Sequence, residues 1–454
     1  MIALLLFCIA CAVYWLWSWK NEKTTEPPLH PGAWPILGHI PRLMTVKDSC
    51  VLTDPDDCLT VSNACLEKDP YYRFAEDWLG DGLVFARCPT WKVHRKLLQP
   101  AFSQTLLDTF IGVFNSQSRK LVKDLDKEVG KGPFYHWSTV RHNALETICI
   151  TALGVDFSDT NLNNDYFEAS DTMFNIIVER FLKFWWHFNC TFAWSRLKKK
   201  QDACLKILHN LSDTVTRQHY FIYLLASTSG RNFKPFIDIL LELADEKGAF
   251  TDKQIRNHID TILVAGQDTS ATVLVYTTLL LGSYPEAQEK VFAELQEVLG
   301  GDRDVEKTDL SKLVYMEAFL KESMRFYSIG PLVVRKSETD VKLKNYTLSA
   351  GRTCWLMYYG LHKHPIWGPD AHEFHPERWL EPGRLPNSPG AFAAFSLGKR
   401  NCIGKAYAMM SMKTTLVHIL RHYRIKSDTS KLQFKIDTMM KPHSGHWISI
   451  EKRR

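Results

Sequence analysis

The sequence predicts a mainly α-helical protein with a minor β-sheet region. Long segments with the periodicity of helices dominate the chain, whereas strand-like patches separated by turn residues occupy residues 333–360. No Ser/Gly-rich linker, low-complexity run or internal repeat divides the 454 residues, of which 45% are hydrophobic and 23% charged. This ordinary globular composition indicates one large folded unit after the N-terminal region.

The N-terminal segment 2–19 predicts a transmembrane signal-anchor helix. Its eighteen residues carry no charge, would span about 27 Å as a helix, and end in three closely spaced tryptophans. A cleaved signal peptide would place basic residues before the apolar run and small residues after it. Here nothing basic precedes the run, and Lys20 and Lys23 follow it, so we expect an uncleaved anchor with the remaining chain in the cytosol.

A proline-rich hinge is predicted over residues 20–40. The stretch from Pro27 to His39 reads PPLHPGAWPILGH, and proline both fixes φ and lacks the N–H that a helix requires. We therefore expect a stiff spacer between the anchor and a catalytic domain that occupies residues 41–454.

The helices of the catalytic domain are marked by their ends and by their apolar faces. The strongest is predicted over residues 252–281, where Thr251 is a suitable N-cap and the middle is apolar nearly all round, as in a buried helix. Pro285 opens a second helix, and a third runs from about Leu310 to Phe326 before a Gly-Pro pair stops it. The final third of the chain is loop-rich until a last helix over residues 406–423.

A glycine-containing loop over residues 395–404 carries the strongest chemical signal. It reads FSLGKRNCIG, so Cys402 lies between two glycines, follows an arginine and opens a helix. A helix N-terminus stabilises negative charge, which predicts a thiolate at Cys402. Gly398 permits a turn that a side chain would block, and Gly404 allows a flat ligand to approach closely.

The neighbours of that cysteine suit a flat ligand that carries carboxylates. Phe395 can pack on such a ligand, and Arg400 can pair with a carboxylate. These features match haem with a thiolate as its fifth ligand, which favours O–O bond cleavage. A buried structural cysteine and a catalytic cysteine nucleophile are alternatives that this loop alone leaves open.

The pattern Phe-x-x-Gly-x-Arg-x-Cys-x-Gly, from Phe395 to Gly404, resembles the haem-binding signature of the cytochrome P-450 superfamily. The segments 78–83 and 91–102 are similar to the fatty-acid-hydroxylase clan of this superfamily, including its insect members. The resemblance implies the cytochrome P-450 fold, a haem b cofactor and Cys402 as the axial ligand of the iron.

Glu322, Arg325 and Arg378 resemble the Glu-x-x-Arg motif and the second arginine motif of the same superfamily. Glu322 and Arg325 lie three residues apart on one helix face, and Arg378 lies in the sequence HPERW. Most such charge pairs are solvated surface ion pairs. The resemblance instead implies a buried structural cluster of all three charges behind the haem.

Further residues are implied as haem partners. Trp91 and Arg95 lie four residues apart, hence on one helix face, and Arg335 lies in the strand-like region. The resemblance implies that all three contact the haem propionates, while His94 is expected at the surface. Many relatives in the clan carry a glutamate that can bond covalently to haem at the position of Ala265, so we expect non-covalent haem.

Asp268 and Thr269 interrupt the most apolar predicted helix. A buried aspartate is costly unless it is paired or has a function. Thr269 could bond back to the carbonyl four residues earlier and only bend the helix. The resemblance implies instead that the acid–threonine pair holds water and relays protons to bound dioxygen.

The resemblance implies a monooxygenase that inserts one atom of dioxygen into a lipophilic small molecule, from the cytosolic face of the endoplasmic reticulum membrane. NADPH–cytochrome P-450 reductase, with cytochrome b5 as a further candidate, would deliver the electrons, because the chain has no dinucleotide-binding glycine motif. The docking surface for such an acidic partner would comprise Lys92, Lys96, Lys399 and Lys405. A net charge of +6 without a basic stripe interleaved with aromatic residues argues against nucleic acid as a partner.

Two other functions stay open. The first is a haem-thiolate isomerase or dehydratase acting on peroxides, although such relatives tend to lose the acid–threonine pair that is intact here. The second is an inactive haem-binding membrane protein, because the segment around residues 43–53 is shorter than in the family by tens of residues. An edge helix and part of the sheet would then be missing.

The chain also contains an aromatic run, which consists of Phe181, Phe184, Trp185, Trp186 and Phe188. Such a run suits an access channel or a membrane contact. Ordinary core packing is an equally good interpretation.

Overall fold

The computed structural model describes residues 49–156, 162–225 and 233–453. The anchor expected at residues 2–19 and the hinge expected at 20–40 lie outside these ranges, so both stay predictions. Within the described ranges no helix is long and apolar enough to cross a lipid bilayer.

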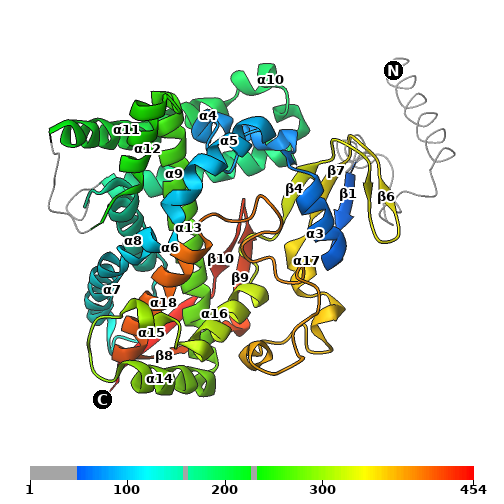
Figure 1. Cartoon of the computed structure of the whole chain (residues 1–454). Helices are drawn as coiled ribbons and strands as arrows, with labels where there is room; N and C mark the ends of the chain where they lie inside the picture. The colour runs from blue at the N-terminus through cyan, green and yellow to red at the C-terminus, as the bar shows by residue number, and fades with distance from the viewer. Residues whose placement is uncertain (1–48, 157–161, 226–232, 454) are drawn as a thin grey trace.

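The architecture is mainly helical, as predicted, and one long helix, α13, runs through the middle of the helical part (Figure 1). The first half of the chain contains α3 (Pro55–Ala64), α4 (Glu76–Leu79), α5 (Cys88–Leu98), α6 (Gln104–Asp108), α7 (Ile111–Leu125), α8 (Trp137–Ile148), α9 (Leu162–Leu182), α10 (Asn189–Ala193) and α11 (Arg196–Leu225). The second half contains α12 (Phe236–Lys247), α13 (Asp252–Ser283), α14 (Pro285–Leu299), α15 (Lys307–Leu310), α16 (Val314–Phe326), α17 (Tyr358–His362) and α18 (Lys405–His422). Helix α8 continues into a π-helical turn, η4 (Cys149–Leu153), and the 3₁₀ turns include η1 (Pro70–Ala75), η5 (Phe184–Trp186), η7 (Pro376–Trp379) and η8 (Thr429–Lys431).

Helix α13 forms because the sequence supplies both a start signal and a continuous apolar surface. Thr251 and Gln254 form a capping box, in which Thr251 Oγ1 accepts from the Gln254 N–H at 3.3 Å and Gln254 Oε1 accepts from the Thr251 N–H at 3.0 Å. Most side chains from Ile255 to Leu281 are buried, since α8 and α11 pack against the helix. The predicted helix over residues 252–281 and its N-cap are confirmed.

Helix α16 begins later than the sequence suggests. A start at about Leu310 is expected, whereas α15 ends there and α16 starts at Val314. The carboxylate of Glu294, on α14, accepts from the N–H groups of Tyr315 and Met316 at 2.6 and 2.9 Å. This side chain from another helix satisfies N–H groups at the start of α16, which no local sequence signal could reveal.

Among the described residues, four small sheets accompany the helices. The strands are β1 (Ser49–Leu52), β2 (Glu67–Lys68), β3 (Phe134–Tyr135), β4 (Val333–Lys336), β5 (Val341–Lys342), β6 (Thr347–Leu348), β7 (Thr353–Leu356), β8 (Tyr423–Ser427), β9 (Gln433–Ile436), β10 (Met440–Ser444) and β11 (Trp447–Lys452). The largest sheet has the order β1-β7-β4-β2, with β1 parallel to β7 and the other pairs antiparallel. The others pair β3-β11-β8, β9-β10 and β5-β6. The strands predicted within residues 333–360 are confirmed.

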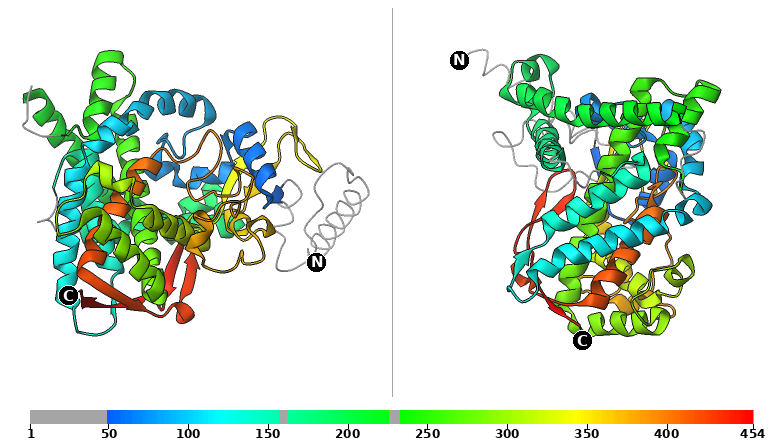
Figure 2. Two further views of the ribbon diagram at one scale, coloured as in Figure 1. Left: turned by 60° about the horizontal axis from the view of Figure 1, so that its bottom comes forward. Right: turned by 90° about the vertical axis from the view of Figure 1, so that its left-hand side faces the viewer.

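Strands β8 to β11 follow the last helix, where the sequence suggested none. They are four to six residues long. In β8 and β11 buried and exposed residues alternate, so Tyr423, Ile425, Ile448 and Ile450 face the core. Alternation over so few residues is a weak signal. These strands lie at one edge of the helical body, close to the C-terminus (Figure 2).

Strand β1 contains the described part of the segment that we expect to be shortened, around residues 43–53. Its Cys50 and Leu52 are buried, while Val51 is 58% exposed. The strand pairs with β7 on one side, and within the described ranges no strand pairs with its other edge. Loss of a neighbouring strand would leave such an open edge, but the shortening itself stays a prediction.

Candidate active site

A cavity of about 470 Å³ lies between α13, α5, strand β4 and the loop over residues 395–404. Most of the side chains that line it are apolar, and its volume suits a cofactor or small-molecule site. The residues selected from the sequence that line it are Trp91, Arg95, Ala265, Thr269, Arg335, Phe395, Arg400, Cys402 and Gly404. Gly398 and Asp268 are not among its lining residues.

The loop that carries Cys402 is shaped by its glycines. Gly398 has a φ of +67°, and a Cβ on it would lie 2.5 Å from the carbonyl oxygen of Ser62, so a side chain is excluded there. A Cβ on Gly404 would meet nothing nearer than Cys402 Sγ at 3.9 Å. The Cys402 N–H donates to the Phe395 carbonyl at 2.8 Å, which closes the loop and turns the cysteine toward the cavity.

Opposing effects act on the pKa of the Cys402 thiol. Burial raises this pKa, while a hydrogen bond from the Gly404 N–H and the charges of Arg95 and Lys405 lower it. Helix α18 begins at Lys405, three residues after Cys402, and the thiolate expected from the sequence stays a prediction. A metal cation on the sulfur would stabilise the thiolate, because a coordinating thiol is deprotonated.

Three cations converge on one wall of the cavity. Arg335 is buried, and its Nε has no hydrogen-bond partner; the same holds for Nε and Nη1 of the buried Arg400. Burial together with these two charges holds the pKa of Lys68 well below its usual range, and burial next to Arg335 lowers the pKa of Arg400 to about 10. Unpaired buried donors and mutual repulsion favour a bound anion, so this wall fits the carboxylates of haem.

Lys68 is the functional residue that the sequence did not reveal. It lies in the two-residue strand β2, directly opposite Arg335 of β4. Its ammonium also stands 4.2 Å from the ring centroid of Tyr72. No motif marks this lysine, because only strand pairing brings it to the cavity.

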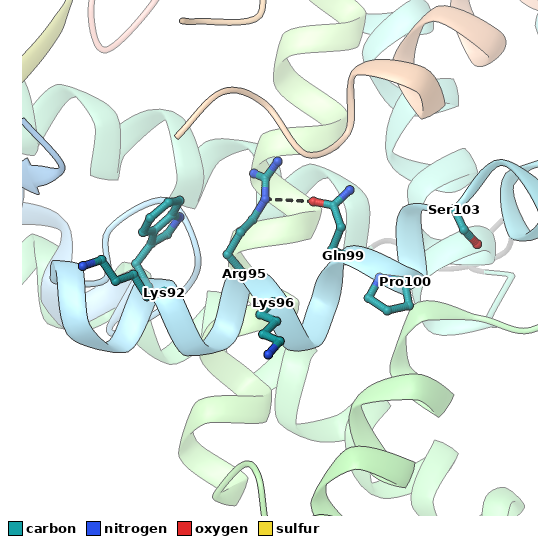
Figure 3. Close-up of a pocket in the computed structure, with 7 residues that line it drawn as sticks. Lys92, Arg95, Lys96, Gln99, Pro100 and Ser103 are labelled. Atoms are coloured by element: carbon teal, nitrogen blue, oxygen red, sulfur yellow. Dashed lines mark hydrogen bonds between the residues drawn. The ribbon is translucent and has the colours of Figure 1, made fainter. Parts of the chain in front are cut away.

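Trp91 and Arg95 share one face of α5, but their surroundings differ. The Arg400 guanidinium lies 4.6 Å from the Trp91 ring. Arg95 donates to the carbonyl and the side-chain oxygen of Asn401 at 2.8 and 3.2 Å. It also donates to Gln99 Oε1 at 3.0 Å (Figure 3). Arg95 therefore ties α5 to the cysteine loop, and a contact of either residue with a propionate stays a prediction.

His94 is not the surface residue that the sequence suggested. Its side chain is buried, its Nδ1 lies 3.0 Å from Nε2 of His258 on α13, and its ring packs on Phe250. Burial lowers the pKa of both histidines, that of His258 to about 3. Position 94 faces inward because it lies three residues after Trp91, on the face of α5 that packs on the core.

The acid and the threonine of α13 point to different surroundings. Thr269 lines the cavity, and its Oγ1 donates to the Ala265 carbonyl at 2.6 Å. This is the local bond that the structural alternative requires. Asp268 is fully buried outside the cavity, with Lys441 Nζ at 2.6 Å and Arg141 Nη2 at 3.6 Å from its carboxylate.

Burial raises the pKa of Asp268, although Lys441 and Arg141 lower it. Arg141 also binds Asp171 of α9 through two hydrogen bonds of 2.6 and 2.7 Å. Asp268 thus belongs to a buried ion cluster that links α8, α9, α13 and β10. Neither lysine nor arginine of this cluster was marked in the sequence.

The three charged residues that the sequence predicted to form a cluster lie together in the structure. Glu322, Arg325 and Arg378 are each fully buried. The Glu322 carboxylate accepts from Arg325 at 2.7 and 2.9 Å and from Arg378 Nε at 3.0 Å. It also accepts from the His375 N–H and from the Trp379 indole, both at 2.9 Å. Five donors on one carboxylate make this a fully satisfied ion cluster.

The aromatic run divides into two groups. Phe181 packs on Tyr71 and Trp355, and Trp186 is half-buried. The exposed members are Phe184, Trp185 and Phe188, and the nearby Trp194 is 92% exposed. None of the five residues of the run lines the cavity, which α9 reaches instead through Phe174 and Ile177.

The four lysines expected to bind a reductase are all exposed: Lys92, Lys96, Lys399 and Lys405. Lys92 and Lys96 line a groove of about 630 Å³ along α5, together with Trp91, Arg95, Gln99, Pro100 and Ser103 (Figure 3). Lys399 and Lys405 flank Arg400 and Cys402 in the adjoining loop. The positive charges thus surround the cysteine side of the cavity.

A family model for cytochrome P450 matches residues 38–448. Among curated proteins, cytochrome P450 4V2 of Rattus norvegicus is 32% identical over 432 residues, which cover 92% of this chain and 81% of the rat protein. Cytochrome P450 4c21 of Blattella germanica is 31% identical over 403 residues, covering 86% of this chain and 80% of the cockroach protein. Cytochrome P450 4c3 of Drosophila melanogaster is 28% identical and covers 92% and 81%, respectively.

Among solved structures, the heme domain of cytochrome P450DA superposes with a TM-score of 0.76 and covers 89% of this chain and 88% of that chain. Its sequence identity to this chain is 22%, so the likeness concerns the fold alone. The mainly helical architecture with small sheets is therefore one that a solved structure shares.

Proposed function

Because the chain belongs to the cytochrome P450 family, we propose that it inserts one oxygen atom from dioxygen into a lipophilic small molecule, using NADPH electrons delivered by a flavoprotein reductase. As a member of this family it is a haem-thiolate monooxygenase with haem b as its cofactor. The observation that carries the proposal is the apolar cavity that has Cys402 on one wall and Thr269 on another. Such a cavity binds lipophilic ligands through burial of apolar surface.

The residues present fit the cofactor. Cys402 would hold the iron, while Arg335, Arg400 and Lys68 would bind the carboxylates, because Arg335 and Arg400 have buried N–H groups without a hydrogen-bond partner in the described structure and both charges act on Lys68. When bound, the haem supplies the activation of dioxygen. Ala265 provides no carboxylate for an ester link, so we propose that the haem is held without a covalent bond.

Thr269 is proposed to position the water that delivers protons to the reacting centre. Its hydroxyl proton bonds to the Ala265 carbonyl, which leaves the Oγ1 lone pairs free to accept from a water in the cavity. Asp268 would resupply protons from the neighbouring helix face. The Asp268 carboxylate does not face the cavity. For this step it must therefore leave its ion pair with Lys441.

Thr269→Ala should keep haem binding but divert electrons to hydrogen peroxide. A positioned proton donor contributes typically 10²–10⁴-fold, so we expect product per NADPH to fall by up to about 10²-fold. The measurement is the yield of product and of hydrogen peroxide per NADPH consumed, with dodecanoic acid as a probe. Thr272→Ala is the matched control, because Thr272 makes the same type of bond, to the Asp268 carbonyl at 2.7 Å, outside the cavity. Equal peroxide yields in both variants would remove Thr269 from the relay.

The function is tested with the purified full chain, a flavoprotein reductase and NADPH. We expect NADPH-dependent oxygen uptake, and a product of a lipophilic probe that carries one atom from labelled dioxygen. A thiolate-type spectrum without oxygen uptake would contradict the monooxygenase proposal. It would favour the isomerase, dehydratase or inactive alternatives.

The proposed electron donor is an acidic reductase that docks on the lysines around the cysteine side. Reversing charge in Lys92→Glu/Lys96→Glu should raise the reductase concentration for half-maximal reduction by roughly 10-fold, the lower end of electrostatic steering effects. It should also weaken the dependence of the reduction rate on salt. The control is Lys342→Glu/Lys431→Glu, which changes the same charge at exposed lysines of β5 and η8. Identical reduction kinetics in the two double variants would exclude this surface.

We also propose that the surface of η5 and α10 contacts the endoplasmic reticulum membrane. Phe184, Trp185, Phe188 and Trp194 are exposed there, and aromatic side chains favour the membrane interface. Helix α11 follows with the exposed cations Arg196, Lys199 and Lys200. Exposed aromatic residues beside basic residues suit an anionic lipid surface.

A further inference from the structure

Three buried cysteines meet where β1, β7 and the end of α3 come together, away from the cavity. Cys50 and Cys354 are directly opposed in the parallel pair of β1 and β7, and Cys65 is the C-cap residue of α3. Their exposed fractions are 8% for Cys50, 0% for Cys354 and 1% for Cys65, all within one apolar cluster. Cys354 forms thiol hydrogen bonds with both of the others.

The strand register suits a covalent bond between Cys50 and Cys354. Directly opposed residues point to the same face of a sheet, and neighbouring strands lie about 4.8 Å apart. A disulfide requires a Cα separation of about 4.4–6.8 Å. The usual spacing of paired strands therefore lies within the range that a disulfide requires.

The hydrogen bond between Cys50 and Cys354 also shifts the pKa values of the two thiols in opposite directions. The side-chain hydrogen bond with Cys354 lowers the pKa of Cys50, and the same contact raises the pKa of Cys354. Burial opposes the lowering at Cys50, and the charge of Arg352 assists it. Cys50 is the most exposed of the three cysteines, so we assign it as the thiol that meets the oxidant and reacts as a thiolate.

We propose that Cys50 and Cys354 form a peroxide-sensitive dithiol that closes into a disulfide between β1 and β7. The Cys50 thiolate attacks hydrogen peroxide, which breaks the O–O bond and gives a sulfenic acid and hydroxide. The hydroxide takes the Cys354 proton and leaves as water. The Cys354 thiolate then attacks the Cys50 sulfur and releases a second hydroxide, which is neutralised by the proton that Cys50 had lost. Two thiols and one peroxide thus give one disulfide and two waters.

The position of this bond gives it a structural consequence. A single row of opposed residues crosses the sheet from Cys50 through Cys354 and Arg335 to Lys68. The disulfide would hold β1 against β7, the strand that neighbours Arg335. Oxidation of the two cysteines at one end of the row would thereby restrict the movement of the sheet. The same sheet carries Arg335 and Lys68, two of the cavity cations, at the other end of the row.

The test uses the full-length holoenzyme in its reduced form, treated with a small excess of hydrogen peroxide. After catalase removes the peroxide, the protein is denatured with N-ethylmaleimide and analysed by peptide mass spectrometry and non-reducing electrophoresis. Two of the eleven thiols should be lost to one linked peptide pair containing Cys50 and Cys354. The denatured chain should run faster than the reduced chain, because the bond closes a long loop. Dithiothreitol should reverse both changes.

Single variants decide which thiols take part. Cys50→Ser and Cys354→Ser should each abolish the faster band, while Cys65→Ser and Cys58→Ser should keep it. Cys58 is the matched control, because it is buried in the same apolar cluster but burial raises its pKa. A faster band that persists in Cys50→Ser would overturn the assignment. The assignment would also be overturned if the exposed Cys190 is oxidised but the linked peptide pair of Cys50 and Cys354 is absent from the same sample.

Discussion

Cys402→Ser should abolish the thiolate-type absorbance of the reduced, carbon-monoxide-bound protein and reduce oxygenation to background. Among the described residues no other cysteine lines the cavity, so no second thiolate can replace the iron ligand. A serine hydroxyl does not donate electron density as a thiolate does, and O–O cleavage depends on that donation. The measurements are the spectrum, oxygen uptake with a reductase and NADPH, and haem per protein.

The cations on the cavity wall predict how haem content and activity should differ in Cys402→Ser. Arg335, Arg400 and Lys68 remain, so haem content should fall less than activity. Cys190→Ser is the matched control, because Cys190 is exposed on α10 and outside the cavity. A thiolate-type band that survives in Cys402→Ser, at the intensity of the control, would refute the ligand assignment.

The parts of the site that the sequence predicted are those encoded by local spacing. Gly398 has a positive φ, and a Cβ on it would lie 2.5 Å from the Ser62 carbonyl oxygen; both requirements appear in the sequence as a glycine four residues before Cys402. Thr251 and Gln254 likewise mark the start of α13 by their spacing alone. In both cases the residues that carry the signal lie within four positions of each other in the chain, although the contact that excludes a side chain at Gly398 comes from the distant Ser62.

The parts that the sequence did not predict depend on pairs that are distant in the chain. Lys68 reaches the cavity only because β2 pairs with β4, and His94 is buried because α13 brings His258 to it. Asp268 faces Lys441 of β10, a strand that was itself missed. A helix pattern gives the neighbouring positions on one face, but not the direction from which a partner element approaches.

The second large effect is expected at the buried ion cluster. Glu322→Gln should destabilise the protein by about 3–5 kcal/mol, the usual cost of breaking a buried ion pair by removing one partner. Glutamine keeps the shape of glutamate but not its charge, so the buried Arg325 guanidinium would lose the counterion that it has in Glu322, while Arg378 would retain Asp370. Total stability is about 5–15 kcal/mol, so a large share of it would be lost.

The dependence on pH follows from the same contacts. Burial raises the pKa of Glu322, but the hydrogen bond and charge of Arg325, the His375 N–H and Arg378 outweigh it, so the pKa lies below its ordinary value. A lowered carboxyl pKa stabilises the fold above the unfolded-state pKa of about 4.3, and this contribution is lost as pH falls through the folded-state pKa. The difference between wild type and Glu322→Gln should therefore be constant near neutral pH and shrink in acid.

Urea unfolding at neutral pH and near pH 4, together with haem content, measures this effect. Glu297→Gln is the control, because it removes the same charge from an exposed position on α14. Arg325 also donates at 2.7 Å to the carbonyls of His362, Ala371 and Glu373, so the cluster holds the segment before η7 against α16. We therefore expect Glu322→Gln to lose haem in proportion to stability, since that segment leads into the cysteine loop. Stability equal to that of Glu297→Gln would mean that the arginines find sufficient partners in backbone carbonyls and that the carboxylate is dispensable.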